Sequence, residues 1–253
     1  MKISGSGTIS GGDYNEQISV SGSGAIDGRL RCTELHASGS VRANAQVECT
    51  GEIHISGSGS FEEVITNGAH ISGSFSAKTL TIKGQLRSSG SCRVNGTLTA
   101  NEAHVSGSLY SGGDAKFGSA EFSGRFDCRG DVEAENFTIS GPVNIDGLLN
   151  AENVAINLGH GTSTNKINSI GGTCIAVKVY NDHKISLFNY GRIVKTTVKE
   201  AVEGDEVYLE NTECPLVVGK TVVIGDGCRI KKVQYYDSCE IKDGAKVDKK
   251  EKI

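Results

Sequence analysis

The chain has 253 residues, a formal net charge of −4, eight cysteines, two prolines and no tryptophan. This near balance of charge lacks the basic footprint of nucleic-acid-binding proteins, so no nucleic-acid partner is expected. No apolar run reaches the length of a membrane span, and Met1 leads straight into the first repeat, so neither a transmembrane segment nor a signal peptide is expected.

The dipeptide Ser-Gly recurs about every seventeen residues through the first three-fifths of the chain. Successive glycines lie 17, 17, 18, 16, 17, 17, 17 and 17 residues apart. A fixed period indicates one structural unit that is stacked on copies of itself. The pairs begin at Ser4, Ser21, Ser38, Ser56, Ser72, Ser89, Ser106, Ser123 and Ser140.

Each repeat holds three apolar-polar-apolar triplets, such as Phe126, Asp127 and Cys128. Alternation with period two is typical of strands, with two residues facing the core and one facing out. Three short strands per coil predict a triangular cross-section, and crossovers between parallel strands are nearly always right-handed. The sequence therefore predicts an all-β, right-handed parallel β-helix, a triangular β-solenoid of about 17 residues per coil.

A second glycine recurs at another corner of the repeat, where glycine supplies a positive φ without steric cost. The glycines at this position are Gly28, Gly96, Gly113, Gly130 and Gly147.

The Ser-Gly marker stops after Ile156, but a period of 17 returns near the end. We predict regular coils over 1–159, an irregular coil over 160–206 and continuing coils with a short charged tail over 207–253. An insertion at about 180–196 fits no coil and is expected to project from the stack. The expected equivalent pairs in the last coils are Leu216 with Val233, Val218 with Tyr235, Val222 with Cys239, Ile224 with Ile241, Cys228 with Ala245 and Ile230 with Val247.

Apolar side chains of the insertion have two interpretations. They fold over the solenoid wall, or they form a patch for a partner or a membrane surface. The residues of this candidate patch are Leu187, Phe188, Tyr190 and Ile193.

The cysteines are predicted to fill the core. Cys32 and Cys49 occupy the same inward slot in adjacent coils, and Cys92 takes a slot that holds Phe75 and Leu109 elsewhere. A free cysteine behaves as a small buried hydrophobe. No CxxC pair occurs, which argues against a zinc knuckle, and reduced thiols favour the cytoplasm.

One polar row stands out on the predicted outer surface. The outward residue of the third triplet is His36, His54, His70, Arg87 and His104 in successive coils. Stacked imidazoles bind transition metals or become charged together near pH 6. Duplication of repeats also produces such rows with no function, and a flat row offers a metal little convergence of ligands. No metal site and no cofactor is therefore predicted.

The two ends of the stack are the expected sites of assembly. Terminal coils expose unpaired backbone groups, and repeated end-to-end pairing gives an open filament. A monomer with charged ends is the alternative. The candidate polymer interface comprises Ile3, Ile9, Val233, Tyr235, Ile241 and Val247.

Enzyme classes built on similar solenoids fit less well. Polysaccharide lyases need clustered carboxylates in a long groove, whereas the acidic residues here are scattered on outward positions. The stretch Val222–Ile230 imitates a hexapeptide acyltransferase turn, but the period is 17 and not 18. The protein is expected not to be an enzyme.

Several stretches resemble the bactofilin family of bacterial polymer-forming cytoskeletal proteins: VSGSGAIDGRL (20–30), ISGSFSAKTLTIKG (71–84), ISGPVNIDGLLNAENVAI (139–156) and VYLENTECPLVVGKTVVIGDGCRI (207–230). The resemblance implies a right-handed triangular β-helix that polymerises end to end, head to head or tail to tail, without nucleotide. It also implies scaffolding of cell-shape, cell-wall or motility proteins in the bacterial cytoplasm, including the inner face of the membrane. A monomeric adaptor that binds through the insertion or the histidine row is the second hypothesis, and a β-helix enzyme is the third.

Overall fold

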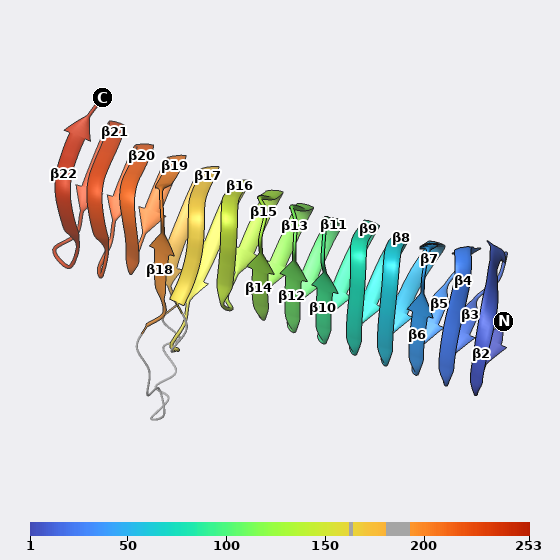
Figure 1. The fold of residues 1–253 in the computed structure, drawn as a ribbon. Helices are drawn as coiled ribbons and strands as arrows, with labels where there is room; N and C mark the ends of the chain where they lie inside the picture. The colour runs from blue at the N-terminus through green and yellow to red at the C-terminus, as the bar shows by residue number, and fades with distance from the viewer. Residues whose placement is uncertain (162–163, 181–192) are drawn as a thin grey trace. The chain divides into compact units, whose positions relative to one another are not determined.

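The computed structural model describes residues 1–161, 164–180 and 193–253. Within these ranges the regular elements are all β-strands, and neighbouring strands pair in parallel (Figure 1). Ser74, Ser91 and Ser108 lie at equivalent positions of successive coils, which gives a repeat of 17 residues. The predicted parallel β-solenoid is confirmed. No helix in the described part of the chain is long and apolar enough to cross a membrane.

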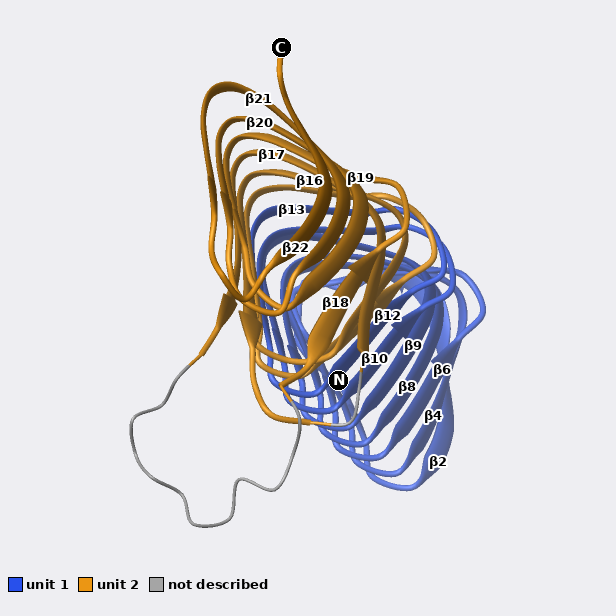
Figure 2. Cartoon of the chain, turned by 90° about the vertical axis from the view of Figure 1, so that its left-hand side faces the viewer, with its two compact units in different colours: residues 1–120 blue, residues 121–253 orange. Residues whose placement is uncertain are grey.

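The chain forms two compact units, residues 1–120 and 121–253, which Figure 2 colours separately. In the first unit each strand pairs with its equivalent in the next coil, for example β4 with β6 and β7. Its strands are β1 (Lys2–Ile3), β2 (Ser6–Asp13), β3 (Ile18–Val20), β4 (Ser23–Cys32), β5 (Leu35–Ala37), β6 (Ser40–Ala43), β7 (Gln46–Ile55), β8 (Ser58–Ile71), β9 (Ser74–Ser88), β10 (Ser91–Val94), β11 (Leu98–Val105), β12 (Ser108–Ser111) and β13 (Ala115–Phe122), which ends two residues beyond this unit.

The core of the first unit is a narrow stack of aliphatic, phenylalanine and cysteine side chains. Phe75, Cys92 and Leu109 occupy one inward slot in successive coils, and all three are buried. Cys32 and Cys49 are likewise paired, with their Sγ atoms 3.6 Å apart. Burial of such side chains supplies about 1.5–3 kcal/mol each for the larger ones, so the stack is the main source of stability.

The Ser-Gly corners are positions of very close backbone approach. At Gly90 a Cβ atom would lie 2.0 Å from the carbonyl oxygen of Gly73, the equivalent glycine of the preceding coil. The corner backbone continues the ladder, because Ser40 N–H donates to the Gly22 carbonyl at 2.8 Å. Glycine is therefore required here by space.

The corner at the second glycine of the repeat differs from the prediction of a positive φ. Gly28 has the positive φ that the sequence predicts, at 94°. Gly96, Gly113 and Gly147 are not among the positive-φ residues, so the prediction is wrong for them. A Cβ atom added at these glycines would instead lie close to the backbone of the preceding coil. At Gly96 the nearest atom is the carbonyl oxygen of Lys78, at 2.8 Å.

Three buried phenylalanine side chains cluster in the core of the second unit. Phe122 and Phe126 stack with ring centroids 4.5 Å apart, and Phe137 lies 5.5 Å and 6.0 Å from them. Cys128 shares its slot with Ile145, as predicted. The strands are β14 (Arg125–Cys128), β15 (Val132–Ile139), β16 (Val143–Leu158), β17 (Thr164–Val179), β18 (Lys195–Val198), β19 (Ala201–Leu209), β20 (Thr212–Ile224), β21 (Arg229–Ile241) and β22 (Lys246–Lys252).

Two predicted boundaries in the second unit are wrong. Lys195 and Thr196, assigned to the insertion, begin β18 and pair with Thr164 and Asn165 of β17. The predicted charged tail is not a tail, because β22 pairs with β21 as far as Lys252. Residues 181–192 lie outside the described residues.

The predicted register between β20 and β21 is also partly wrong. Val217 pairs with Val233, and Gly219 pairs with Tyr235, so the expected partners Leu216 and Val218 are each displaced by one residue. A register shift between Gly219 and Thr221 restores the offset of 17. The expected pairs Val222–Cys239 and Ile224–Ile241, which follow the shift, are confirmed, and so is Ile230–Val247 between β21 and β22.

Candidate functional site

The histidine row lies on one wall of the first unit. His36 pairs with His54 and His54 with His70, in strands β5, β7 and β8. The row continues through Arg87 in β9 to His104 in β11. Each histidine stands between two buried apolar neighbours, such as Ile53 and Ile55 around His54, and Arg87 stands between the buried Leu86 and Ser88. Alternation therefore points the five polar side chains outward, as predicted.

The imidazoles are close enough to influence one another. The ring centroids of His36 and His54 are 4.3 Å apart. Those of His54 and His70 are 4.8 Å apart, and the two ring planes are nearly parallel, at 3°. Partial burial and the neighbouring His36 and His70 lower the pKa of His54, while Glu52 and Glu34 act in the opposite direction. His54 is therefore disfavoured as a cation.

A second row of side chains, two residues earlier in each strand, supplies carboxylates. Glu34 Oε2 lies 3.0 Å from His36 Nε2. Glu52 Oε2 lies 3.2 Å from His54 Nε2 and 3.3 Å from His70 Nε2, so one carboxylate oxygen serves two imidazoles. The sharing is possible because Gly68 has no side chain: a Cβ there would lie 3.0 Å from Glu52 Oε1.

The carboxylate row is interrupted at its centre. Gly68 and Gln85 occupy its third and fourth positions. The Arg87 guanidinium donates to Gln85 Oε1 at 2.5 Å, and Gln85 Nε2 donates to Glu102 Oε2 at 3.1 Å. The guanidinium thus contacts a neutral amide. Sequence reasoning missed this row, although its signal is a Glu or Gln two positions before His36, His54, Arg87 and His104.

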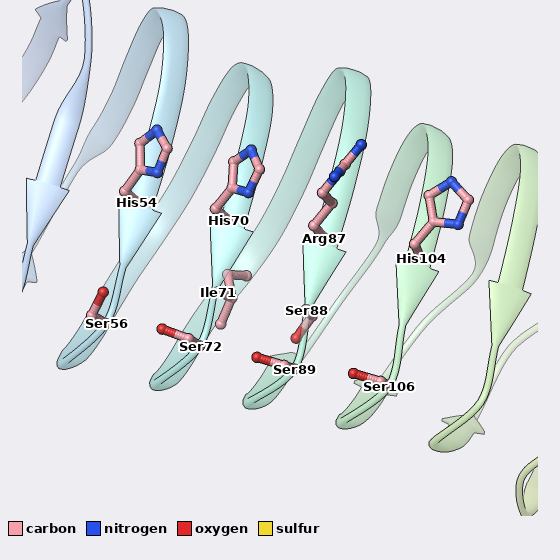
Figure 3. A pocket seen from close by; sticks show the side chains of 10 residues that line it. All are labelled: His54, Ser56, His70, Ile71, Ser72, Arg87, Ser88, Ser89, His104 and Ser106. Carbon is pink, nitrogen blue, oxygen red and sulfur yellow. The ribbon is translucent and has the colours of Figure 1, made fainter.

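A row of serines borders the histidine row on its other side. Figure 3 shows His54, His70, Arg87 and His104 projecting from successive strands above the serines of the next corner. Together they line a shallow depression of about 550 Å³. The serines are Ser56, Ser72, Ser89 and Ser106.

The depression carries no ready metal site. No group of three or more His, Cys, Asp or Glu side chains in the described ranges is arranged to hold a metal ion. The predicted row of His36, His54, His70 and His104 is present, and its binding of a metal stays untested.

The predicted polymer-interface residues divide into two groups. Ile9 and Val233 are almost fully buried and belong to the core of their own coils. Ile3, Tyr235, Ile241 and Val247 are half-buried. The half-buried group is the part of the prediction whose side chains reach the surface.

The last coil ends on charged side chains. Lys250 of β22 lies in register with Val233, its Nζ donates to the Cys239 carbonyl at 2.8 Å, and it lies 5.2 Å from the centroid of the Tyr235 ring. An ammonium group therefore covers this end of the apolar stack.

Of the candidate patch in the insertion, Leu187, Phe188 and Tyr190 lie outside the described residues. Ile193 is described: it is exposed and forms an isolated antiparallel bridge with His160. Six of the cysteines are buried, whereas Cys174 and Cys239 are only half-buried, so core filling does not hold for these two.

A surface depression of about 490 Å³ in the second unit was not predicted. It combines four cations with Pro215 and the edge of the buried Ile230. Glu213 is paired with Lys195 and lies 3.9 Å from Arg229. The cations are Lys199, Arg229, Lys231 and Lys246.

Comparison with known proteins gives one partial match. The chain is 38% identical over 98 residues to the uncharacterized protein YhbF of Bacillus subtilis (strain 168). The match covers 39% of this chain and 39% of that relative, so the aligned region spans well under half the length of either protein. No family model matches the chain. No solved structure matches it either.

Proposed function

We propose that the protein is a bacterial cytoskeletal scaffold that assembles end to end into filaments without nucleotide. The observation that carries the proposal is the parallel pairing itself. The first strands, β1 and β2, pair with β3 and β4, and the last strand, β22, pairs with β21. A strand that pairs along one edge has a second row of backbone donors and acceptors, which a second copy of the chain would satisfy.

Side chains at the first coil support a contact between copies. Ile3 is half-buried and Met1 is 43% exposed, so apolar surface accompanies the outer edge of β1. The resemblance of the repeats to bactofilins points to the same mode of assembly. In this proposal the protein acts in the cytoplasm, performs no catalysis and recruits proteins of cell shape, cell wall or motility to its repetitive walls.

The charged last coil favours a second candidate, a monomeric adaptor. Lys250 covers the apolar stack, and Lys249 and Lys252 lie on the same strand. Like charges oppose a tail-to-tail contact. The adaptor would bind its partner through a wall of the solenoid.

Electron microscopy and sedimentation of single and double variants separate the two candidates. The wild-type chain is expected to form filaments. Ile3→Lys and Ile241→Lys are each expected to leave dimers joined through the remaining end, and the double variant is expected to be monomeric. Leu148→Lys is the matched control, because Leu148 is 39% exposed on β16, a strand that pairs with β15 and β17, whereas Ile241 has no partner in β22.

Thermal melting establishes that each variant keeps its fold. A sharp monomer peak for the wild-type chain would overturn the filament and favour the adaptor. Equal loss of filaments in Leu148→Lys and Ile3→Lys would show that the end coils are not the contact.

A further inference from the structure

We propose that Cys32 and Cys49 are a redox pair, which a small peroxide converts into a disulfide that ties two adjacent coils together. The two residues lie on β4 and β7, inside the first unit. The inference is therefore independent of the filament, which is proposed to form through the first and last coils.

The register of the strands holds the two thiols side by side. Cys32 pairs with Cys49, and their Sγ atoms are 3.6 Å apart. Neighbouring strands lie about 4.7–4.9 Å apart. Disulfides join Cα atoms that are about 4.4–6.8 Å apart, with the sulfurs at about 2.05 Å. The strands therefore need not move, because rotation of the two side chains brings the sulfurs to bonding distance.

Packing alone does not require two cysteines in this slot. Cys92, a core cysteine of the same unit, lies between Phe75 and Leu109 and so has apolar neighbours in the adjacent coils. The slot of Cys32 and Cys49 accepts other small or aliphatic residues further along the stack. In the next three coils it holds Thr66, Ile82 and Ala100.

The contact between the thiols also prepares one of them to react. The thiolate is the reactive form of a cysteine. A hydrogen bond from the Cys49 thiol lowers the pKa of Cys32, although burial acts in the opposite direction, and the same contact raises the pKa of Cys49. The pair therefore loses its first proton more readily than its second. This assigns Cys32 as the attacking residue and Cys49 as the resolving one.

The surroundings of the pair select a small oxidant. Cys32 is 1% exposed and Cys49 2%, which excludes bulky reagents from the folded core. On the side away from β7, strand β2 ends at Asp13, opposite Arg31, so Cys32 lies just beyond the last residue pair of these strands. The adjacent segment 14–17 is not in a strand, and residues 15–17 are exposed. Segments of this kind open locally at low cost in free energy, which admits a peroxide.

The reaction balances with one peroxide for each pair. The Cys32 thiolate attacks one oxygen of hydrogen peroxide and the O–O bond breaks. A sulfenic acid forms, and the departing hydroxide takes up the proton that Cys32 lost. The Cys49 sulfur then attacks the Cys32 sulfur and the S–O bond breaks, so that hydroxide leaves with the Cys49 proton as water. Two thiols thus give two electrons to one peroxide, which yields one disulfide and two waters, and a dithiol reductant reverses the change by exchange.

The bond is expected to stabilise the first unit. It links residues 17 positions apart, and a cross-link of this length restricts the unfolded chain far more than the folded one. The oxidised protein is expected to melt about 5 °C or more above the reduced protein.

Peptide mapping of the full chain tests for the disulfide. The protein is treated with hydrogen peroxide, its remaining thiols are blocked with N-ethylmaleimide under denaturing conditions, and trypsin is added. Arg42 lies between the two cysteines, so trypsin places them in separate peptides. The expected product is these two peptides joined, with a mass two hydrogens below their sum, and dithiothreitol should release them. Recovery of both cysteines as maleimide adducts, with oxidation confined to the half-buried Cys174 and Cys239, would overturn the proposal.

Variants assign the two roles. Cys32→Ala and Cys49→Ala are each expected to abolish the joined peptide, and alanine already occupies this slot at Ala100. In Cys49→Ala, dimedone should trap a sulfenic acid at Cys32, whereas Cys32→Ala should give none at Cys49. Cys92→Ala is the matched control, because it removes a buried thiol of the same unit and should leave the joined peptide unchanged.

Thermal melting under reducing conditions shows whether each variant is folded. Peroxide should raise the melting temperature of the wild-type chain and of Cys92→Ala, but not that of folded Cys49→Ala. Trapping at Cys49 in place of Cys32 would overturn the assignment of roles. A joined peptide without a rise in melting temperature would overturn the claim that the bond ties the coils together.

Discussion

At the scale of single residues, the Ser-Gly corner shows how little space the stack leaves. Equivalent glycines lie directly over one another, and a Cβ at Gly39, Gly57 or Gly107 would be 2.0 Å from a carbonyl oxygen of the preceding coil. Real Cβ atoms do not approach a heavy atom so closely, and the opposing atom is backbone. The motif thus recurs because the backbone of one coil must clear that of the next.

Gly90→Ala is predicted to destabilise the protein by well over ~1 kcal/mol, since the residue does not fit the native backbone. Urea unfolding measures the loss. Gly5→Ala is the matched control, because Gly5 holds the same place in the motif but has no atom within 4 Å of its Cβ position. Similar losses in both variants would contradict the steric explanation.

His54 predicts a pH dependence of stability. Its pKa in the folded protein is lowered, chiefly by burial and then by the two neighbouring histidines, so the unfolded chain binds this proton more readily. Where the unfolded state binds more protons, stability rises with pH. The contribution is therefore intact above about pH 6.5 and declines as pH falls from there through the lowered pKa.

Urea midpoints from pH 8 to pH 5 test this dependence. His54→Gln is expected to flatten the profile, whereas His160→Gln should leave its slope unchanged. A profile that stays equally steep in His54→Gln would show that other groups carry the effect.

At the scale of strands, alternation predicted most inward positions but not every register. The triplets around Asp127, Glu133 and Thr138 have one outward residue between two apolar ones, and their flanking residues are buried. Leu216, Val217 and Val218 are three consecutive apolar residues, so alternation alone does not say which one faces the core. The register shift after Gly219 resolves the ambiguity in favour of Val217, which is 0% exposed.

The registers of β20 and β21 yield a direct prediction. Val217→Lys places a charge in the core and is expected to cost several kcal/mol, in the range of about 3–5 kcal/mol or outright unfolding. Leu216→Lys, at a half-buried position, is expected to cost less than about 1 kcal/mol. Chemical denaturation compares the two, and the reverse order would restore the register that the sequence suggested.

For the candidate site, the sequence predicted the positions of the side chains but not their contacts. The positions of His36, His54, His70 and His104 follow from the repeat, because equivalent residues of successive coils are in register. The sharing of Glu52 by two imidazoles does not follow from the repeat. It depends on the missing side chain of Gly68 and on the rotamer of Glu52, which only the three-dimensional structure supplies.

At the scale of the whole molecule, the first and last strands of the chain differ in their side chains. Strand β1 brings Ile3 to the surface, while β22 brings Lys249, Lys250 and Lys252. Glu251 forms ion pairs with Lys232 at 2.9 Å and Lys249 at 3.6 Å, which neutralises part of this charge. In the proposed filament the first end associates through apolar surface and strand edges, and the second does so against residual repulsion.

This difference predicts opposite responses to salt. Salt screens exposed charges: the Debye length falls from about 20–30 Å near 0.01–0.02 M to less than ~8 Å above 0.15 M. Ile3→Lys, which leaves only the lysine-rich end, should dimerise more strongly as sodium chloride rises from about 20 to 300 mM. Ile241→Lys, which leaves the apolar end, should change little over the same range. Sedimentation equilibrium measures both dimer constants, and a stronger salt response in Ile241→Lys would mean that the charge on β22 does not oppose association.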